Sequence, residues 1–563
     1  LSKYYFYYKR REKMKKRKRR NFKRFIAAFL VLALIISLVP ADVLAKSTEE
    51  ENGNRIAADD PEETLQKEQT EEAVPFDPKD INKEGEITSE RTENTKLYYE
   101  GDGVYKQEVY LDPIHTKETP DADWEDISPE LKESTSKQVE TENAILNSDF
   151  QKQMKNGLYA TFEHNDHKLT YSLVEAKGPN KTSLTPKDTP ADYKTDGNEI
   201  VYPDVFPNID LQTFTFNENI KEDVVLHQYD GYNTFTFQLK TDLQAKEQED
   251  GSIDFSDEKG KVVFSVPKPF MTDSKLDELS GEVERSDKVS YKLEKNEEGY
   301  LLHLTADENW LKDPERVYPV SIDPSTSLSV SSDTFVMSAY PTTNYSASSQ
   351  KWDANLKAYV LKTGYYDKTT GTNYAFMKFN NLKPIQNMTV TKATLKTYVA
   401  HSYYGTKATG LWLDTVNSNY DHAKVTWNTK PASKNIGKAD VHKGQWASYD
   451  VTAAVKSWNS GGANYGFKLH ANGNGKEYWK KLISSANSNN KPYIEVTYTI
   501  PKASAPAVKA YNNGNGTGFF NISWKKAEGA KGYKVWIYNG KEYQAISVGN
   551  TTSWSTKGKN IWP

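Results

Sequence analysis

The stretch TKATLKTYVAHSYYGTKATGLWLDTV, residues 391–416, alternates apolar and polar side chains on either side of a polar turn that contains Gly. Because successive side chains of a β-strand point to opposite faces of a sheet, this alternation predicts two half-buried strands, over residues 391–401 and 409–416. Similar short segments, bounded by Gly, Asn, Asp or Pro, recur between residues 95 and 500. A helical spacing of apolar residues occurs over residues 451–458. The predicted fold class is all-β, with tandem β-sandwich or jelly-roll-like domains.

The composition supports this fold class and excludes several kinds of site. The chain has 563 residues, including 36 Tyr and 12 Trp, and contains no Cys. Aromatic residues are enriched in strands, and the lack of Cys excludes disulfide scaffolds, thiolate zinc sites and cysteine nucleophiles. The sequence has no HExxH, GxSxG or Walker motif and no GxGxxG that opens a helix, so we predict no catalytic residue.

The N-terminal region has the three parts of a secretory signal peptide. The basic cluster KKRKRRNFKR, residues 15–24, precedes an apolar run over residues 25–39, and a small-residue exit ends at Ala45. A membrane-spanning helix needs about 20 apolar residues, so we expect cleavage after Ala45, with an uncleaved anchor as the alternative. The residues before Met14 are expected to be an upstream reading-frame extension, so residues 1–45 are assigned to that extension and the signal peptide.

Charge divides the remaining chain into an acidic front and a basic rear. Residues 46–100 contain 7 basic and 17 acidic side chains, residues 101–324 contain 24 and 47, and residues 325–563 contain 29 and 11. Residues 46–94 combine high charge with almost no apolar periodicity, which predicts a disordered acidic linker. We expect a β-rich domain over residues 95–324 to follow this linker.

Residues 325–500 resemble a known family of domains on bacterial surface proteins. The motifs occur in the family's order: Asp333, YPTTNYS (340–346), FMKF (376–379), KATLKTYV (392–399), VTWNTKP (425–431), YDVTAAVKSW (449–458), NYGFKL (464–469) and ISSANSNNKPYIEVTY (483–498). They are similar to the DNRLRE-type domain, also treated as a carbohydrate-binding module, which implies a β-sandwich. The ISW and GYKVWIY strings in residues 501–563 resemble the first strands of a fibronectin type III domain, so a linker and a truncated domain of that kind are expected there.

The whole chain resembles the N-terminal portion of the wall-associated Rhs/YD-repeat toxins of Bacillus. The segment WLKDPERVYPVSIDP, residues 310–324, is similar to the segment that introduces the DNRLRE-type domain in such proteins. In that family a C-terminal tRNA nuclease inhibits neighbouring cells, and we expect the present sequence to be a fragment without it. The resemblance implies a secreted export, wall-binding and presentation region at the surface or in the cell wall of a Gram-positive bacterium. A cognate immunity protein would bind the missing toxin domain.

The basic rear of the chain points to a polyanionic partner. All 29 basic residues of 325–563 are Lys, so this part carries compact, hydrated charges without the planar guanidinium groups used in bidentate recognition. Such charges suit delocalised attraction to a cell-wall polyanion or glycan, such as teichoic acid or peptidoglycan, and not to nucleic acid. We expect the membrane to be a partner only during export. The alternative is a Lys-rich solvated surface with no specific partner.

Exposed aromatic residues in the rear half are candidate sugar platforms, because the C–H faces of sugars lie well on aromatic rings. The candidates for carbohydrate binding are Trp352, Trp446, Trp479, Tyr403 and Tyr404.

No cofactor is predicted apart from a structural calcium ion, for which Asp333, Asn344 and Asp450 are the candidate ligands. A competing hypothesis is a wall-polysaccharide-active enzyme, a glycosidase or lyase, whose acidic domain cuts the polymer that its carbohydrate-binding module holds. Because residues 101–324 contain 47 acidic side chains, proximity in sequence nominates no catalytic carboxylate pair.

Overall fold

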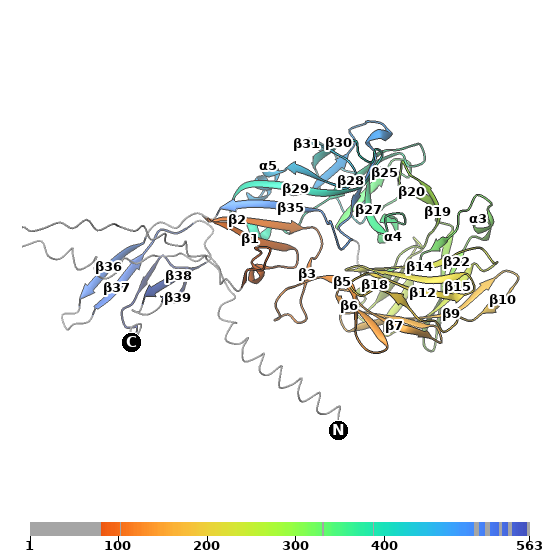
Figure 1. The fold of residues 1–563 in the computed structure, drawn as a ribbon. Coiled ribbons are helices and arrows are strands. Elements are labelled where there is room, and N and C mark those ends of the chain that lie inside the picture. The colour runs from red at the N-terminus through yellow and green to blue at the C-terminus, as the bar shows by residue number, and fades with distance from the viewer. Residues whose placement is uncertain are drawn as a thin grey trace, which may run out of the picture.

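A computed structural model of the chain describes residues 80–559, except residues 102, 329–331, 387, 500–505, 513–517, 528–531 and 539–542. Two large β-sandwiches lie side by side, and a small pair of sheets follows them at the C-terminal end (Figure 1). The predicted fold class is therefore confirmed. The predicted signal peptide, the upstream extension and most of the acidic linker lie outside the described residues. None of the helices within the described ranges has the length and apolar character that a transmembrane segment needs.

The first sandwich consists of two antiparallel sheets. In sheet order, the nine-stranded sheet contains β21 (Val289–Asn296), β22 (Gly299–Ala306), β15 (Thr234–Thr241), β9 (His167–Gly178), β8 (Leu158–His164), β7 (Asn147–Lys155), β6 (Gln138–Asn143) and β5 (Ser128–Glu133), with β10 (Lys181–Leu184) paired to β9. The eleven-stranded sheet contains β11 (Asp192–Tyr193), β12 (Glu199–Phe206), β13 (Ile209–Thr215), β14 (Asn219–Leu226), β24 (Thr326–Ser327), β18 (Val262–Val266), β17 (Ile253–Ser256) and β16 (Gln244–Glu247), with β19 (Met271–Asp277), β20 (Glu282–Ser286) and β23 (Val320–Ile322) attached beside β14.

The alternation in these strands directs one set of apolar side chains into the space between the two sheets. Phe150, Phe162 and Phe237 come from the nine-stranded sheet, and Leu211 and Phe255 come from the eleven-stranded sheet; all five side chains are fully buried in one cluster. Burial of aromatic and branched side chains is the main stabilising contribution in a domain of this kind.

The second sandwich is one continuous, curled network of thirteen antiparallel strands. In order, they are β1 (Thr95–Gly101), β2 (Val104–Tyr110), β35 (Tyr493–Thr499), β29 (Thr389–Ser402), β34 (Lys480–Ile483), β27 (Ala358–Tyr365), β28 (Thr372–Met377), β33 (Phe467–His470), β30 (Thr409–Val416) and β31 (Ser433–Val441), with β25 (Asp333–Met337) on β28, β26 (Trp352–Asp353) on β27 and β32 (Gln445–Asp450) on β29. Its core contains apolar residues from all parts of this network, including Leu395, Leu413 and Leu482.

The first two strands join a sheet that the sequence did not predict for them. β1 and β2 form a hairpin, and β2 also pairs with β35 along its whole length, from Val104 opposite Thr499 to Tyr110 opposite Tyr493. The apolar face of the hairpin packs into the core of the second sandwich. Residues 95–110 therefore belong to the second sandwich and not to the domain predicted over residues 95–324.

Residues 80–94, predicted as the end of a disordered linker, also pack on the second sandwich. Ile87 is fully buried in its core, with Ile81 packed against it. Glu86 forms a buried ion pair of 2.7 Å with Arg91, so the charge of this buried carboxylate is neutralised locally. The linker prediction missed these contacts because two isoleucines among many charged residues give no periodic signal.

The two sandwiches share an extensive interface. The hairpin β19–β20 reaches the second sandwich, where the indole nitrogen of Trp479 donates a hydrogen bond of 2.9 Å to the carbonyl oxygen of Ser280. Next to it, the buried ammonium of Lys481 lies 3.1 Å from a carboxylate oxygen of Glu282 and 2.5 Å from one of Asp353. Removing either partner of such a buried pair leaves an uncompensated charge, so these contacts fix the mutual position of the sandwiches.

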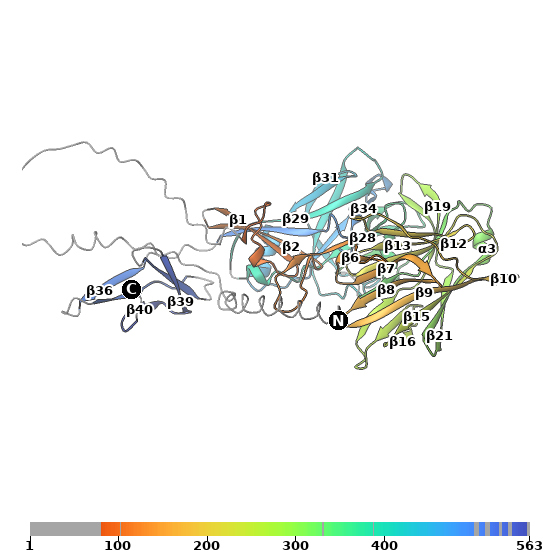
Figure 2. The same cartoon turned by 60° about the horizontal axis from the view of Figure 1, so that its bottom comes forward.

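The remaining elements are short. Among the described residues the helices are η2 (Thr88–Glu90), α3 (Glu308–Lys312), α4 (Ser348–Lys351), η3 (Lys383–Ile385), α5 (Thr452–Asn459) and η4 (Lys476–Tyr478), and a two-stranded sheet joins β3 (His115–Thr116) to β4 (Glu125–Asp126). Helix α5 confirms the helix predicted over residues 451–458. The C-terminal part contains β36 (Ala507–Asn512), β37 (Gly518–Ser523), β38 (Tyr533–Tyr538), β39 (Tyr543–Gly549) and β40 (Ser553–Ser555), visible apart from the sandwiches in Figure 2. A small apolar cluster that includes Ile522, Trp524 and Val535 holds these strands together. The resemblance of this C-terminal part to a fibronectin type III domain stays a prediction.

Candidate functional site

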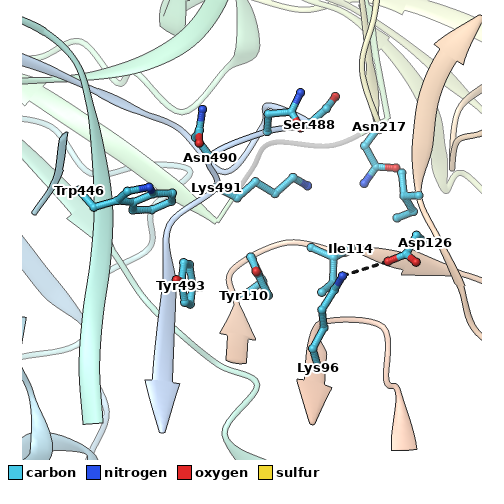
Figure 3. Close-up of a pocket in the computed structure, with 12 residues that line it drawn as sticks. Lys96, Tyr110, Ile114, Asp126, Asn217, Trp446, Ser488, Asn490, Lys491 and Tyr493 are labelled. Atoms are coloured by element: carbon cyan, nitrogen blue, oxygen red, sulfur yellow. Dashed lines mark hydrogen bonds and ion pairs between the residues drawn. The ribbon is translucent and has the colours of Figure 1, made fainter. Parts of the chain in front are cut away.

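A row of aromatic rings crosses the outer face of the second sandwich. Trp446 of β32 lies 5.4 Å from Tyr398 of β29 and 5.7 Å from Tyr493 of β35, measured between ring centroids. Tyr493 in turn stacks on Tyr110 of β2 at 5.2 Å. The rings of Trp446, Tyr493 and Tyr110 follow one another across neighbouring parts of the sheet (Figure 3). We call these four residues the aromatic row.

Strand register places these rings on one face. Tyr398 is directly opposite Trp446, and Tyr110 is directly opposite Tyr493, so both pairs are cross-strand neighbours. The neighbours of these residues along each strand, such as Ile494 and Ala447, point into the core and are fully buried. Trp446 keeps 37% of its surface exposed. The second sandwich therefore presents a solvent-accessible aromatic surface on the back of a rigid sheet.

The aromatic row borders a pocket of about 340 Å³ between the second sandwich and the connection to the first. The lining residues are Lys96, Tyr110, Ile114, Asp126, Ile127, Asn217, Trp446, Ser488, Asn489, Asn490, Lys491 and Tyr493. Most of the polar side chains in this lining are hydrogen-bond donors or amides. The pocket thus combines flat apolar rings with a polar floor, which is the usual composition of a small-ligand site.

One wall of the pocket is held by ion pairs. Lys96 lies 3.1 Å from Asp126, which also lies 2.9 Å from Arg91 and 3.5 Å from the imidazole of His115. The neighbouring His115, Lys96 and Arg91 hold the pKa of Asp126 well below its usual range. Asp126 is therefore ionised and neutralised by its neighbours, and it leaves no free negative charge at the pocket mouth.

Two tyrosines of the row, Tyr493 and Tyr110, remain hydroxyl donors. Burial, followed by the charges of Glu108 and Glu495, raises the pKa of Tyr493 to about 12. The hydroxyl of Tyr110 donates a hydrogen bond of 2.9 Å to Glu108, and burial raises its pKa above the ordinary value. Both phenols are therefore protonated across the physiological range.

Comparison with known proteins places this chain in a family. It is 50% identical over 214 residues to the wall-associated protein of Geobacillus stearothermophilus, and these residues are 84% of that relative and 38% of the chain. The chain belongs to the wall-associated protein family. It is also 95% identical over 563 residues to the tRNA(Glu)-specific nuclease WapA of Bacillus subtilis subsp. natto, and 96% identical over 543 residues to the tRNA nuclease WapA of Bacillus subtilis. It spans about a quarter of the length of these two curated relatives, 24% and 23%.

A second match concerns the sandwich that carries the aromatic row. Residues 324–498 of this wall-associated protein match carbohydrate-binding module family 96. The matched residues contribute Trp446, Tyr493 and Lys491 to the pocket, whereas Lys96 and Tyr110 come from the N-terminal hairpin outside the match. Asn217, between β13 and β14, also lines the pocket, so the pocket is assembled from several segments that lie far apart in sequence.

The structure places the predicted sugar-binding residues in different environments. Trp446 lies in the aromatic row. Tyr403 and Tyr404 form a half-buried pair, 5.0 Å apart, in the turn after β29. Trp352 and Trp479 were expected at the surface but are buried, with 8% and 0% of their surface exposed. The first sandwich covers both rings, an arrangement that no local sequence pattern indicates.

Sequence reasoning missed Tyr110, Tyr398, Tyr493 and Lys491. The first three alternate with core residues along their strands, and this period-two position was the available signal for an outward-facing ring. Lys491 precedes β35 in an irregular segment, where no pattern distinguishes it from the other lysines of the rear half.

The three candidate calcium ligands are each bound to other parts of the protein. Asp333 is fully buried and lies 3.2 Å from the ammonium of Lys351. The side-chain amide of Asn344 donates to two backbone carbonyl oxygens, those of His422 and Val425, and Asp450 accepts a hydrogen bond from the backbone of Thr452. The described part of the chain contains no group of three or more His, Cys, Asp or Glu residues placed to hold a metal ion.

Proposed function

We propose that this region of the wall-associated protein retains its parent protein in the cell wall by binding wall glycans on the aromatic row of the second sandwich. The observation that carries the proposal is the row itself, with Trp446 exposed and Tyr493 and Tyr110 beside it at the edge of a polar pocket. Sugar rings present C–H faces that pack on aromatic rings, and their hydroxyls need polar partners at the rim of such a platform. The kinship of residues 324–498 with a carbohydrate-binding module family supports the same ligand class.

The surrounding charge supports retention in an anionic envelope. Lysines such as Lys424, Lys443 and Lys456 are exposed on the second sandwich, and residues 325–563 contain 29 Lys against 11 acidic residues. Diffuse attraction of this kind raises the local concentration of a polyanion such as teichoic acid without fixing its orientation. It weakens as the ionic strength rises, whereas stacking on the aromatic row is insensitive to salt.

At the level of the whole protein, we propose a role in export and presentation. Two relatives that contain this region are named tRNA nucleases. The signal peptide, the acidic linker and the two sandwiches would bring such a nuclease through the membrane and display it at the surface of a Gram-positive cell. A cognate immunity protein would bind the toxin domain of the parent protein. The nuclease would then inhibit neighbouring cells on contact.

A sedimentation experiment tests the glycan-binding proposal. The chain is mixed with purified sacculi at high ionic strength, where the diffuse lysine attraction is screened, and the bound fraction is measured for the unmodified protein and for Trp446→Ala. We expect the substitution to lower the affinity about tenfold, because one exposed stacking surface is lost.

The matched control is Tyr340→Ala, since Tyr340 is a similarly exposed aromatic residue (47%) that lies outside the pocket lining. It should leave the affinity unchanged. Equal binding of all three proteins at high ionic strength would contradict the proposal, and release of soluble sugar fragments from the sacculi would favour the competing enzyme hypothesis.

A further inference from the structure

The floor of the pocket contains a buried ammonium group with spare hydrogen-bond donors. Lys491 has only 7% of its surface exposed, and its ammonium donates one hydrogen bond, of 3.1 Å, to the backbone carbonyl oxygen of Pro113. No ion pair among the described residues includes Lys491. Figure 3 shows its side chain extending over the tyrosine rings toward Asn217. An ammonium has three N–H donors, so two of them have no acceptor among the residues that the structure describes.

Four other buried lysines of the same molecule have oxygen acceptors for their ammonium groups. Lys221, Lys351 and Lys481 each lie 2.5 to 3.2 Å from a buried carboxylate oxygen. Lys480 has no carboxylate partner, but its ammonium reaches three oxygen acceptors at 2.7, 3.1 and 3.3 Å. Because burying a charge without partners is strongly unfavourable, proteins satisfy such groups, and Lys491 departs from the pattern of its neighbours.

A second group in the same pocket also lacks a partner. The hydroxyl oxygen of Ser488 is buried and makes no hydrogen bond to any described residue. Ser488 and Lys491 both line the pocket, as do the amide side chains of Asn217 and Asn490. The carboxylate in this lining, Asp126, is already paired with Lys96 and Arg91. The floor of the pocket therefore offers positive charge and donors and has no free carboxylate to balance them.

We propose that Lys491 and Ser488 form a subsite for one oxyanion, a phosphate or a carboxylate, carried by a glycan whose sugar ring lies on the aromatic row. This inference rests on the glycan-binding function proposed above and specifies its ligand as an acidic wall polymer. The oxyanion accepts hydrogen bonds from the ammonium of Lys491 and the hydroxyl of Ser488, which are charge-assisted and strong in a buried site.

The electrostatics of the pocket agree with this assignment. Burial lowers the pKa of Lys491, and the negative charges of Asp112, Glu218 and Asp333 only partly oppose that effect. A bound oxyanion would stabilise the charged ammonium and raise this pKa again. Ligand binding thus supplies the partner that the protein itself does not.

Calorimetric titration of the full chain tests the subsite with three probes: a glycerol phosphate oligomer that carries glucosyl side groups, a carboxylated sugar tetramer (tetragalacturonate) and a neutral N-acetylglucosamine tetramer. Lys491→Met should weaken binding of one or both anionic probes roughly tenfold and change the affinity for the neutral probe less than about twofold. Loss confined to the phosphate probe identifies a phosphodiester polymer as the source of the oxyanion, and loss confined to the carboxylated probe identifies an acidic sugar.

Ser488→Ala provides a second variant whose folding is not in question, because its hydroxyl makes no internal hydrogen bond. We expect a two- to fivefold loss of affinity for the same anionic probe. Lys456→Met is the matched control: it removes the same charge from an exposed position of helix α5 and should leave all three affinities unchanged.

The two proposals fail differently. If Lys491→Met and Ser488→Ala bind every probe as the unmodified chain does, while Trp446→Ala weakens binding, the oxyanion subsite is wrong and the glycan platform stands. If none of the probes and no sacculi bind to the unmodified chain at high ionic strength, the proposed function itself is wrong.

Discussion

The molecule contains two aromatic clusters on the outer faces of its sheets, and they have opposite environments. Around Trp352, the rings of Phe214, Phe216 and Tyr359 lie 5.4 to 6.0 Å from the indole and are sealed between the two sandwiches. Around Trp446, rings at comparable distances are half-buried, and the indole itself remains exposed to solvent. Both clusters are built from alternating strand residues. The neighbouring domain alone decides which of them stabilises the fold and which is available to a ligand.

The largest expected effect comes from the closed cluster. Trp352→Ala should lower the free energy of unfolding by roughly 3–5 kcal/mol, because it leaves a cavity where the indole filled the interface. Urea unfolding measures this effect. Trp446→Ala is the matched comparison and should cost less than about 1 kcal/mol, since its ring is exposed. A small loss for Trp352→Ala would show that the two sandwiches do not depend on this interface.

The next effect concerns a buried carboxyl of the first sandwich. Glu222 is fully buried, accepts a hydrogen bond of 2.8 Å from the hydroxyl of Tyr159, and burial raises its pKa from 4.5 to about 8. The folded protein therefore holds this proton at pH values where the unfolded chain releases it. As the pH rises from 4.5 to 8, the contribution of Glu222 to the free energy of unfolding falls.

Glu222→Gln removes this dependence. Urea unfolding at about pH 4.5 and at pH 8 gives the difference in unfolding free energy between the variant and the unmodified chain. From the lower to the higher pH, this difference should shift by roughly 2–4 kcal/mol in favour of the variant. The substitution Glu278→Gln, at an exposed position of the β19–β20 turn, is the control and should give no such gain. Parallel pH profiles for Glu222→Gln and the unmodified protein would mean that the carboxyl ionises normally in the folded state.

The smallest effect tests how far the open cluster extends. Tyr110 lies outside the segment that matches the carbohydrate-binding module family, yet its ring stacks on Tyr493. Tyr110→Ala should weaken binding to sacculi about fivefold, in the range expected for one aromatic contact. Tyr511→Ala, which removes an exposed ring (43%) from the C-terminal sheets, is the control. If Tyr110→Ala binds normally, the hairpin supports the platform without touching the ligand.

The difference between the two aromatic clusters also explains which parts of the structure could be predicted from the sequence. Alternation along residues 391–416 predicts β29 and β30 almost to the residue, because one face of each strand is buried whatever the partner. The same local argument cannot distinguish Trp352, Trp446 and Trp479, because whether each ring is buried depends on whether the other sandwich covers it. The hairpin β1–β2 was recognisable, but its pairing with β35 joins residues nearly 400 positions apart, and no short-range pattern encodes that choice.

The route of the backbone has a mechanical consequence. The chain enters the second sandwich through residues 80–110, leaves it to build the whole first sandwich, and returns to finish on β35, directly beside β2. Tension applied between the N-terminal side of residue 80 and the C-terminal side of β35 therefore passes through the β2–β35 hydrogen bonds. The first sandwich carries no load while that seam holds, and rupture of the seam would pass the load to the first sandwich.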